Sequence, residues 1–542
     1  RLQLQQVSGA VAVGVSCEPK DVAESGAKRQ RAQAMRGVDA ETADLAKWVI
    51  SFVAAALVCW LVFFRLRKLG RHQGKKQPPG PWALPLVGNL GISNTVALYR
   101  RCVEWGKVYG PIFRIKIGAT NVVILSDVKI WKEFVAMEES LIRPHQSVVY
   151  QACRGYLGIA TLNGEAWADN RRFCLRVLRD LGFGKTAVED HIKQQLQSLV
   201  NQIEDSKGTA IPIKECLFSI SFNVISAVLF GSTYKDSDHK HRNVKTHIMT
   251  FMRALATHSL VDYIPVWLST VMSYVPFTEV AKIRKTVRLP REFISAQVME
   301  HRDTLEEDTT RDFIDGYLKQ MMDQKDDPNS HYRECHLIGC AMDFFAAGVA
   351  GVPLVIHWLL LICAQNPNKV QSRIHAEIDR VVGRERQPAW KDRLEMPFTM
   401  ACIWELQRWR KDGLLGFPRG VKEDILLEGF LIPKGTVVLP NTTAMNRNPH
   451  YWKRPDEYDP TRFLTPDGTE LIKKPEYFIP FSYGKRMCPG ESLATVQLFL
   501  YTTFLLQKFC VLPEEGRQLP CLDPLVTDGN DPAVQKLRFV AR

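Results

Sequence analysis

The chain has 542 residues, of which 46% are hydrophobic and 24% are charged, and its 71 Lys and Arg against 58 Asp and Glu give a formal net charge of +13. This composition excludes collagen-like and wholly disordered chains, and without a long basic run or zinc-finger spacing it argues against a nucleic-acid-binding protein. The length exceeds the ~250 to 300 residues at which single cores usually stop growing, so it suggests two domains or one unusually large one.

The first segment, residues 1–47, is a leader that begins with Arg rather than Met. Met35 stands shortly before the apolar segment that follows, where an initiator residue would make sense. We therefore expect residues 1–34 to be no part of the natural protein. N-terminal sequencing that found them on the natural protein would contradict this expectation.

Residues 48–64 form an uncharged apolar segment that we expect to be a transmembrane helix. Its length lies at the lower end of the ~17 to 25 residues that span a bilayer. No small-residue cleavage site follows it, which favours a retained anchor over a signal peptide. Acidic residues precede the segment and the basic cluster from Arg65 to Lys76 follows it, so the positive-inside rule places the rest of the chain in the cytosol. The 13 scattered cysteines agree with that reducing compartment.

A basic and Pro-rich linker, residues 65–81, ends in Pro78-Pro79-Gly80-Pro81, which we interpret as a stiff hinge. Residues 82–542 follow as one large domain. Apolar and charged residues alternate over residues 113–117 and an apolar run resumes at 122–125, which predicts an antiparallel strand pair. Helical periodicity covers much of the rest, including residues 190–203, 335–363, 370–382, 396–409 and 493–509. The predicted fold is mainly α with small β-sheets.

The most informative segment is FSYGKRMCPGE, residues 481–491, which leads into an apolar helical pattern. Cys488 stands just before the start of that helix, where unpaired backbone N–H groups favour a thiolate over a thiol. Lys485 and Arg486 add positive charge nearby. A thiolate in such a place is a metal ligand or a nucleophile.

The pattern F-x-x-G-x-R-x-C-x-G of this segment is similar to the haem-ligand loop of the cytochrome P450 family, and every fixed position is filled. The resemblance implies haem b as the cofactor, with Cys488 as the axial ligand of its iron. It further implies that Arg486 pairs with a haem propionate, that Phe481 packs beside the sulfur and that Gly484 fills the glycine position of the loop. A thiolate ligand favours O–O cleavage.

Further motifs extend the resemblance from residue 78 to the C-terminus, closest to animal microsomal members of the family-two type. Glu405 and Arg408 form an E-x-x-R motif whose spacing puts both charges on one helix face. The family's second partner motif supplies Arg462 to the same structural charge cluster. The resemblance also implies three more haem contacts, namely Trp167, Arg171 and Arg419.

The oxygen-side helix departs from the family pattern, in which an acid and a threonine help to deliver protons. Here these positions are Ala350 and Gly351, and Pro353 should loosen or kink the helix. General acid-base help of this kind contributes typically 10² to 10⁴ in rate. Asp343 lies seven residues before Ala350, on the same side of the helix, as a candidate displaced acid, although such a residue is more often structural.

Three functions stay open at this point. The first is a monooxygenase that relays protons through water held in the gap beside Gly351. The second is a haem-thiolate isomerase or dehydratase that acts on a hydroperoxide and needs neither proton relay nor reductase. The third is a non-catalytic haem-binding or ligand-binding member of the family.

No dinucleotide-binding or P-loop pattern is present, so electrons from NADPH would arrive through a separate NADPH-cytochrome reductase, with cytochrome b5 as a further candidate partner. Arg172, Arg176, Arg179 and Lys485 are candidates for its docking face. The resemblance places the protein in the endoplasmic reticulum membrane, with the haem domain on the cytosolic side. The expected substrate is a lipophilic small molecule. Its expected pocket residues are Phe344, Phe345, Ala347, Leu414, Leu415 and Phe417.

Overall fold

The computed structural model describes residues 75–84, 88–89, 95–118, 120–144, 155–182, 186–234, 238–256, 266–409, 416–519 and 535–542, together with Trp48, Ser51, Phe52 and Leu522. The expected leader and anchor lie almost wholly outside these residues. From Lys76 to Arg542 the chain forms one compact unit, which we call the body.

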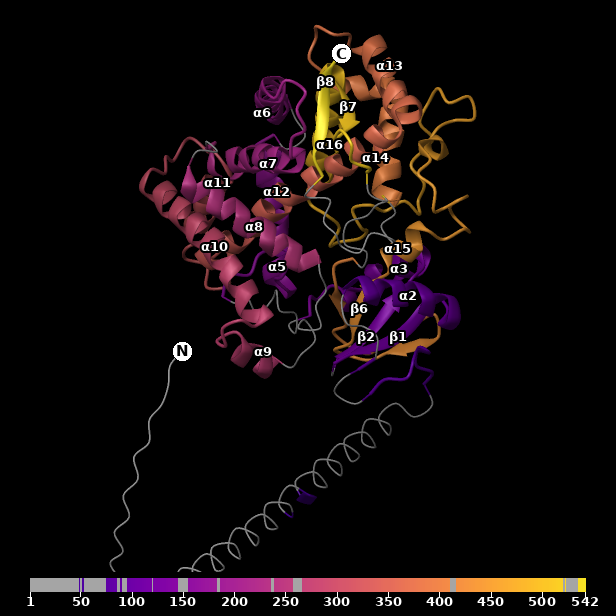
Figure 1. The fold of residues 1–542 in the computed structure, drawn as a ribbon. Helices are drawn as coiled ribbons and strands as arrows, with labels where there is room; N and C mark the ends of the chain where they lie inside the picture. The colour runs from indigo at the N-terminus through magenta and orange to yellow at the C-terminus, as the bar shows by residue number, and fades with distance from the viewer. Residues whose placement is uncertain are drawn as a thin grey trace, which may run out of the picture. The chain divides into compact units, whose positions relative to one another are not determined.

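Most described elements of the body are helices, and the fold class predicted from the sequence is confirmed (Figure 1). The helices are α2 (Thr95–Tyr109), α3 (Val128–Ala136), α5 (Gly164–Asp180), α6 (Thr186–Asp205), α7 (Ile213–Phe230), α8 (His239–Ala256), α9 (Val266–Met272), α10 (Glu279–Asp303), α11 (Phe313–Asp323), α12 (Glu334–Gln365), α13 (Ser372–Val381), α14 (Pro397–Trp409), α15 (Thr442–Asn446) and α16 (Glu491–Lys508). Short 3-10 or π turns cover Glu138–Ser140, Pro367–Gln371, Trp390–Glu395 and Pro460–Phe463. Each stretch with predicted helical periodicity coincides with a helix or a helical turn.

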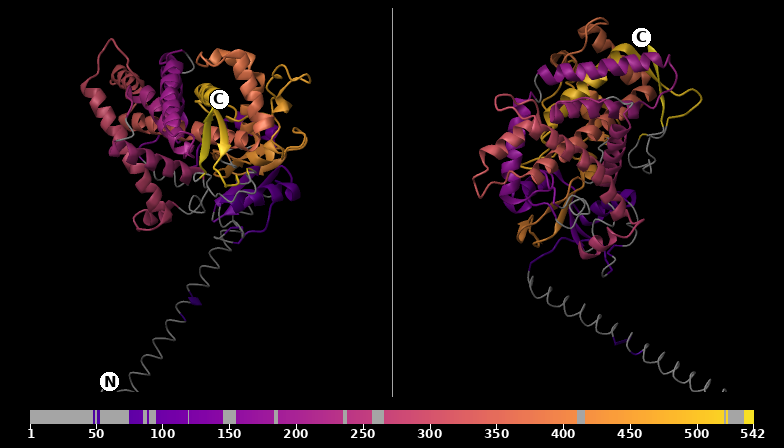
Figure 2. Two further views of the ribbon diagram at one scale, coloured as in Figure 1. Left: turned by 45° about the horizontal axis from the view of Figure 1, so that its top comes forward. Right: turned by 90° about the vertical axis from the view of Figure 1, so that its left-hand side faces the viewer.

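The strands form small separate sheets. They are β1 (Ile112–Ile117), β2 (Thr120–Leu125), β3 (Arg419–Gly420), β4 (Ile425–Leu427), β5 (Phe430–Ile432), β6 (Val437–Pro440), β7 (Phe509–Pro513) and β8 (Leu537–Ala541). The predicted strand pair is β1 and β2, which are antiparallel. The order of the largest sheet is β1-β2-β6-β3, and β6 joins β2 in parallel from far along the chain. β4 pairs with β5, and β7 pairs with β8 in an antiparallel pair near the C-terminus, yellow in Figure 2.

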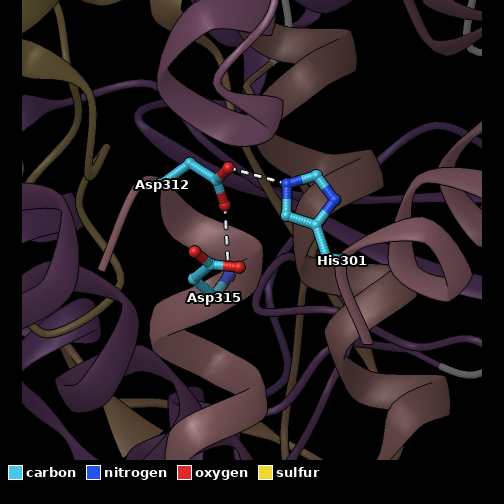
Figure 3. A group of neighbouring side chains, drawn as sticks. All are labelled: His301, Asp312 and Asp315. Atoms are coloured by element: carbon cyan, nitrogen blue, oxygen red, sulfur yellow. Dashed lines mark hydrogen bonds and ion pairs between the residues drawn. The ribbon is translucent and has the colours of Figure 1, made fainter. Parts of the chain in front are cut away.

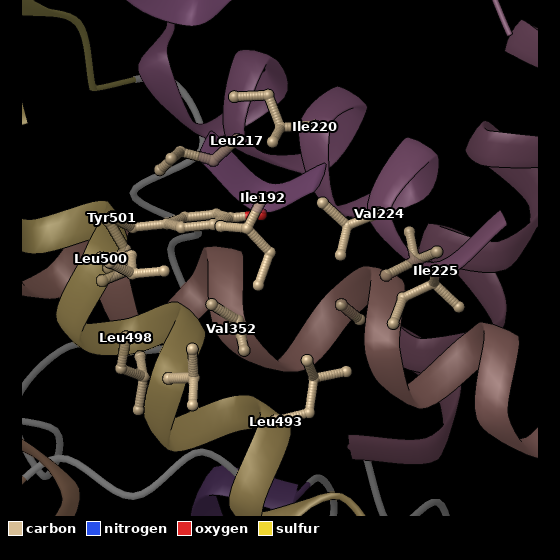
Figure 4. Close-up of a cluster of buried hydrophobic side chains, with 14 of the residues drawn as sticks. Ile192, Leu217, Ile220, Val224, Ile225, Val352, Leu493, Leu498, Leu500 and Tyr501 are labelled. Atoms are coloured by element: carbon tan, nitrogen blue, oxygen red, sulfur yellow. The ribbon is translucent and has the colours of Figure 1, made fainter. Parts of the chain in front are cut away.

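The core lies where α6, α7, α12 and α16 meet. Figure 4 shows side chains from these helices interlocking, with Ile192 of α6, Val224 of α7, Val352 of α12 and Leu500 of α16 among them. Two described helices, α7 and α12, are long and apolar enough to cross a membrane. Both are mostly buried inside the body, as core helices are, because their side chains face other helices on nearly all sides.

The end of the expected linker packs on the body. The backbone N–H of Arg114 in β1 donates to the carbonyl of Pro79 at 2.7 Å, and that of Leu431 in β5 donates to Lys76 at 2.8 Å. A Cβ atom at Gly80 would lie 1.9 Å from the Arg114 carbonyl oxygen, so this close approach requires glycine.

Candidate functional site

Cys488 lies in a tight loop directly before α16. Its backbone N–H donates to the carbonyl of Phe481 at 2.9 Å, and the N–H of Met487 donates to Gly484 at 2.9 Å. Gly484 has φ of 80°, and a Cβ atom there would also approach the Val135 carbonyl of α3 to 3.2 Å. The loop therefore depends on a glycine at this position, and it leaves the Cys488 side chain exposed.

Arg486 points inward from the same loop and is only 5% exposed. Its guanidinium lies 4.0 Å from the ring centroid of Trp167 in α5 and donates to the Leu162 carbonyl at 2.7 Å. The Nε of Arg486 and the Nε1 of Trp167 are buried donors without a hydrogen-bond partner. Because buried donors are nearly always satisfied, these two groups indicate a missing acceptor.

Four arginines face one another here, namely Arg143, Arg171, Arg419 and Arg486, and we call them the arginine cradle. Burial and the charges of neighbouring arginines lower the pKa of Arg486 to about 9 and that of Arg419 to about 10. Arg419, in β3, is 2% exposed and leaves its Nε and Nη1 unpaired. Arg171 donates to the carbonyl of Met487, beside the cysteine. Like charges brought together in a buried place call for anions.

Arg143 is the member of the cradle that sequence reasoning missed. It donates to the carbonyls of Ala160 at 3.1 Å and Pro418 at 2.6 Å, and its guanidinium lies 4.4 Å from the ring centroid of Phe417. Burial, together with the charges of the other three arginines, lowers its pKa. Its sequence signal is an arginine before Pro144, which is too common a pair to identify a site.

The oxygen-side helix is α12, and it is continuous through Pro353. One side of this mainly buried helix is open: Ala347 and Gly351 are exposed, and Asp343 is half-buried. Gly348 faces α7 instead, because a Cβ atom there would lie 2.5 Å from the Ile225 side chain. A Cβ atom at Gly351 would meet no heavy atom within 4 Å. We call Asp343, Ala347 and Gly351 the open strip. It carries no side chain larger than a carboxylate.

The structure places the expected pocket residues in different surroundings. Ala347 belongs to the open strip, and Phe345 belongs to the core. Phe345 is a core residue and not pocket lining: it is fully buried, and its ring packs with those of Phe222, Phe230 and Phe293. Successive helix residues are about 100° apart, so Phe345 faces away from Ala347. Phe344 is half-buried and packs edge-to-face with Phe313. Phe417 is 45% exposed, and Leu414 and Leu415 lie outside the described residues.

A loop of residues 155–163 joins the open strip to the arginine cradle. Its Ala160 donates a backbone N–H to the Asp343 carboxylate at 2.8 Å, while its carbonyls accept from Arg143 and Arg486. The loop crosses α12 in close backbone contact, because a Cβ atom at Gly158 would lie 2.3 Å from the Gly339 carbonyl oxygen. Burial raises the pKa of Asp343 to about 7, against the Ala160 hydrogen bond and the charge of Arg143, which lower it.

The structure also brings together Glu405, Arg408 and Arg462, which we call the charge cluster. Arg408 binds both carboxylate oxygens of Glu405 at 2.7 Å, and Arg462 Nε donates to the same carboxylate at 3.0 Å. Glu405 and Arg408 have no exposed side-chain surface. Arg408 makes further hydrogen bonds to the carbonyls of Asn446 and Pro455, so every charge here has partners.

A second buried group, His301, Asp312 and Asp315, has donor atoms close enough to suggest a metal site (Figure 3). Its groups already satisfy one another. His301 bonds the Gln297 carbonyl and the Asp312 carboxylate, each at 2.7 Å, and Arg311 holds both oxygens of Asp315. A divalent ion would have to displace these bonds, so the group is a structural link between α10 and α11.

Taken together, the site offers an exposed cysteine, a buried set of unpaired cationic donors and an open, mainly apolar strip. Haem has a flat apolar ring, two propionates and an iron that takes an axial thiolate. The exposed Cys488 fits the iron, and the unpaired nitrogens of Trp167, Arg419 and Arg486 fit the propionates.

Comparison with known proteins agrees with this fit. The family model described as Cytochrome P450 matches residues 78–532. The chain belongs to the cytochrome P450 family. Cytochrome P450 2H2 of Gallus gallus is 32% identical over 491 residues, which cover 90% of this chain and 98% of that relative. Cytochrome P450 2A3 of Rattus norvegicus is 31% identical over 501 residues, 92% of this chain and all of the relative. As a cytochrome P450, the protein is a haem-thiolate monooxygenase by class, and the predicted family is confirmed.

Proposed function

We propose that this cytochrome P450 inserts one oxygen atom from O2 into a lipophilic small molecule, with electrons from NADPH supplied by a separate reductase. The observation that carries the proposal is the set of unpaired buried donors beside the Cys488 loop. A protein does not keep such groups together without an anionic ligand, because each unpaired buried donor destabilises the fold by about 1 to 3 kcal/mol.

In this proposal Cys488 provides the axial thiolate, and Arg171, Arg419, Arg486 and Trp167 hold the propionates, with Arg143 as a fifth contact. The haem supplies oxygen activation, which an axial thiolate favours. The protein's own part is to orient the group and to keep its thiolate ligand in place. The helix start at α16 and the nearby Arg171 stabilise negative charge on the sulfur.

The open strip of α12 has the character of a substrate face. Ala347 and Gly351 offer no hydrogen-bonding side chain, so an apolar substrate rests there without leaving polar groups unpaired. A Cβ atom at Gly351 would meet no heavy atom within 4 Å, and water beside this residue can form part of a proton path where the usual acid and threonine are absent.

The family and the surface charge support our proposals for electron delivery and location. Arg172 and Lys485 are exposed; Arg172 pairs with the half-buried Asp169 at 3.7 Å, and Lys485 pairs with the exposed Glu138. Such charges suit an acidic redox partner, for which we propose a NADPH-cytochrome reductase, with cytochrome b5 as a second partner. We place the protein in the endoplasmic reticulum membrane with its body in the cytosol.

The test is the amount of product and of hydrogen peroxide formed per NADPH, measured on the membrane-bound protein with reductase and a panel of lipophilic substrates. Substantial product supports the proposal. Cys488→Ala should abolish the shifted Soret band of the ferrous carbonyl complex, whereas Cys216→Ala, a half-buried cysteine of α7, should leave it unchanged. An unchanged band in Cys488→Ala would refute the ligand assignment.

A second candidate is a haem-thiolate isomerase or dehydratase that acts on a hydroperoxide. The loss of both proton-relay groups at Ala350 and Gly351 favours it, because such a reaction needs no protons from α12. It predicts rapid turnover of lipid hydroperoxides without reductase and little NADPH-dependent product. A protein that binds haem and shows neither activity would be a non-catalytic member of the family.

A further inference from the structure

Asp343 is the one acidic side chain in the interior of α12. The other carboxylate of this helix, Glu334, stands in its first turn at the surface and pairs with Arg302. Asp343 instead belongs to the open strip, where it stands beside Ala347 and Gly351, which have no polar side chain. Even a half-buried carboxylate in an apolar setting destabilises the fold unless it has a function or full pairing.

The open strip connects this carboxyl to the position of the missing acid and threonine. Asp343, Ala347 and Gly351 are spaced four residues apart, which puts them on one side of the helix. The distance from Asp343 to Gly351 along the axis is about 12 Å, and about three or four hydrogen-bonded waters cover such a span. No bulky side chain of the strip stands between the two ends.

The surroundings of Asp343 leave it able to hold a proton at neutral pH. One oxygen accepts the Ala160 N–H at 2.8 Å. Arg143, from the segment before the loop, and Cys340, one turn earlier on α12, are the titratable groups that interact with it among the described residues. Burial raises its pKa to about 7, so both the acid and the carboxylate are populated at neutral pH.

We propose that Asp343 is a displaced proton donor, which supplies protons through water along the open strip to the space beside Gly351, for the oxygen chemistry that a bound haem would supply. The Asp343 O–H bond breaks as its proton passes to the first water, and each water hands on one proton in turn. The carboxylate left behind keeps the Ala160 hydrogen bond and the charge of Arg143, and it regains a proton from solvent. This inference rests on the proposed monooxygenase function, since the electrons come from the reductase.

The first test compares Asp343→Asn, Asp343→Glu and the wild type as membrane-bound holoproteins with reductase. Asn still accepts from the Ala160 N–H but releases no proton. We expect Asp343→Asn to lower product per NADPH about tenfold or more, with a matching rise in peroxide, and Asp343→Glu to restore much of it. Glu334→Gln, on the same helix, is the matched control and should change nothing. Equal haem content in all variants separates this effect from loss of the cofactor.

A second readout does not depend on turnover. In infrared difference spectra of the resting protein between about pH 6 and about pH 8, on either side of the pKa of about 7, a carboxylic acid band should disappear at the higher pH and be missing in Asp343→Asn. If Asp343 were ionised throughout this pH range, no such band would appear, and the proposed proton donor would be ruled out. Wild-type product with unchanged coupling in Asp343→Asn overturns the relay alone, whereas a wild type that forms no product overturns the proposed function and the relay with it.

Discussion

The charge cluster and the arginine cradle are both buried groups of arginines, and they differ in one respect. In the charge cluster, Arg408 and Arg462 share the carboxylate of Glu405, and backbone carbonyls take the remaining Arg408 donors. In the arginine cradle, Arg419 and Arg486 face other arginines and keep nitrogens without partners. A buried cation that has all its partners is part of the architecture, whereas one that lacks them marks the position of a ligand.

This difference predicts opposite responses to mutation. Removing a member of the charge cluster leaves an unpaired buried charge in every state of the protein. Arg143, Arg171 and Arg486 also bond backbone carbonyls, whereas Arg419 leaves its Nε and Nη1 unpaired. Removing Arg419 therefore relieves repulsion in the protein without haem and destabilises only the complex with haem, so stability and cofactor affinity should separate between Arg419 and the charge cluster.

The largest expected effect is in the charge cluster. Arg408→Ala leaves Glu405 buried with one partner fewer and should lower the free energy of unfolding by roughly 3 to 5 kcal/mol. Chemical denaturation measures this. Arg101→Ala, which removes an exposed pair with Glu104, is the control and should change the free energy by less than about 1 kcal/mol. A small effect of Arg408→Ala would mean that the cluster is not a structural element.

The next effect is in the arginine cradle. Arg419→Met removes two unpaired buried N–H groups that would bind a propionate, so haem affinity should fall by about 10-fold to 100-fold, the value of a charged hydrogen bond. Haem titration of the apoprotein, followed at the Soret band, measures this. The thermal midpoint of the apoprotein should stay the same or rise. A lower apoprotein midpoint would place Arg419 with the architecture instead.

The link between α10 and α11, His301 with Asp312 and Asp315, is also a buried group whose charges are paired. Because His301 titrates, its contribution to stability should depend on pH. Burial lowers the pKa of His301, but its bonds to Asp312 and the Gln297 carbonyl outweigh burial and raise the pKa above its usual value. The stabilisation is then complete below the unfolded-state pKa of about 6.5 and is lost as pH rises through the raised folded-state pKa. The thermal midpoint of the wild type should therefore fall as the pH rises above about 6.5 and through the raised pKa of His301.

His301→Gln serves as the check on that pH dependence. It should be less stable than the wild type at about pH 6, and the gap should narrow at about pH 9, because the wild type has then lost the imidazolium charge. A gap that stays constant over the whole range would show that His301 is neutral in the folded protein.

The smallest effect concerns the exposed charges near Cys488. Lys485 pairs with Glu138 at 2.9 Å, with both side chains exposed, so Lys485→Ala should change stability by less than about 1 kcal/mol. If this face receives the reductase, the same variant should slow haem reduction at low salt, and added salt should remove the difference. Stopped-flow reduction at two ionic strengths measures both.

The sequence predicted those parts of the molecule that local patterns encode. Helical period located α6, α12, α14 and α16, and the fixed spacing around Cys488 identified the family. Contacts between residues far apart in the chain could not be predicted, because no local sequence pattern encodes them. The approach of Arg143 to Arg419, and that of Asp343 to Ala160, depend on how the loop of residues 155–163 crosses α12.

The misplacement of Phe345 has a different physical origin. The aromatic pair Phe344 and Phe345 follows Asp343 directly, and one charged residue does not show which of two successive aromatic side chains meets the core. In the structure, Phe345 packs against aromatic rings of α7 and α10 and is part of the core, whereas Phe344 packs against Phe313 of α11.

The crossing of Gly158 over Gly339 has a consequence for how two ligands influence each other. Because no side chain separates the two backbones, the loop of residues 155–163 and α12 are in direct contact and should move together. A substrate that shifts α12 also shifts the carbonyls that orient Arg143 and Arg486, and through them the propionate contacts. By thermodynamic reciprocity, a substrate that tightens haem binding must itself bind more tightly to the haem-loaded protein, by the same factor.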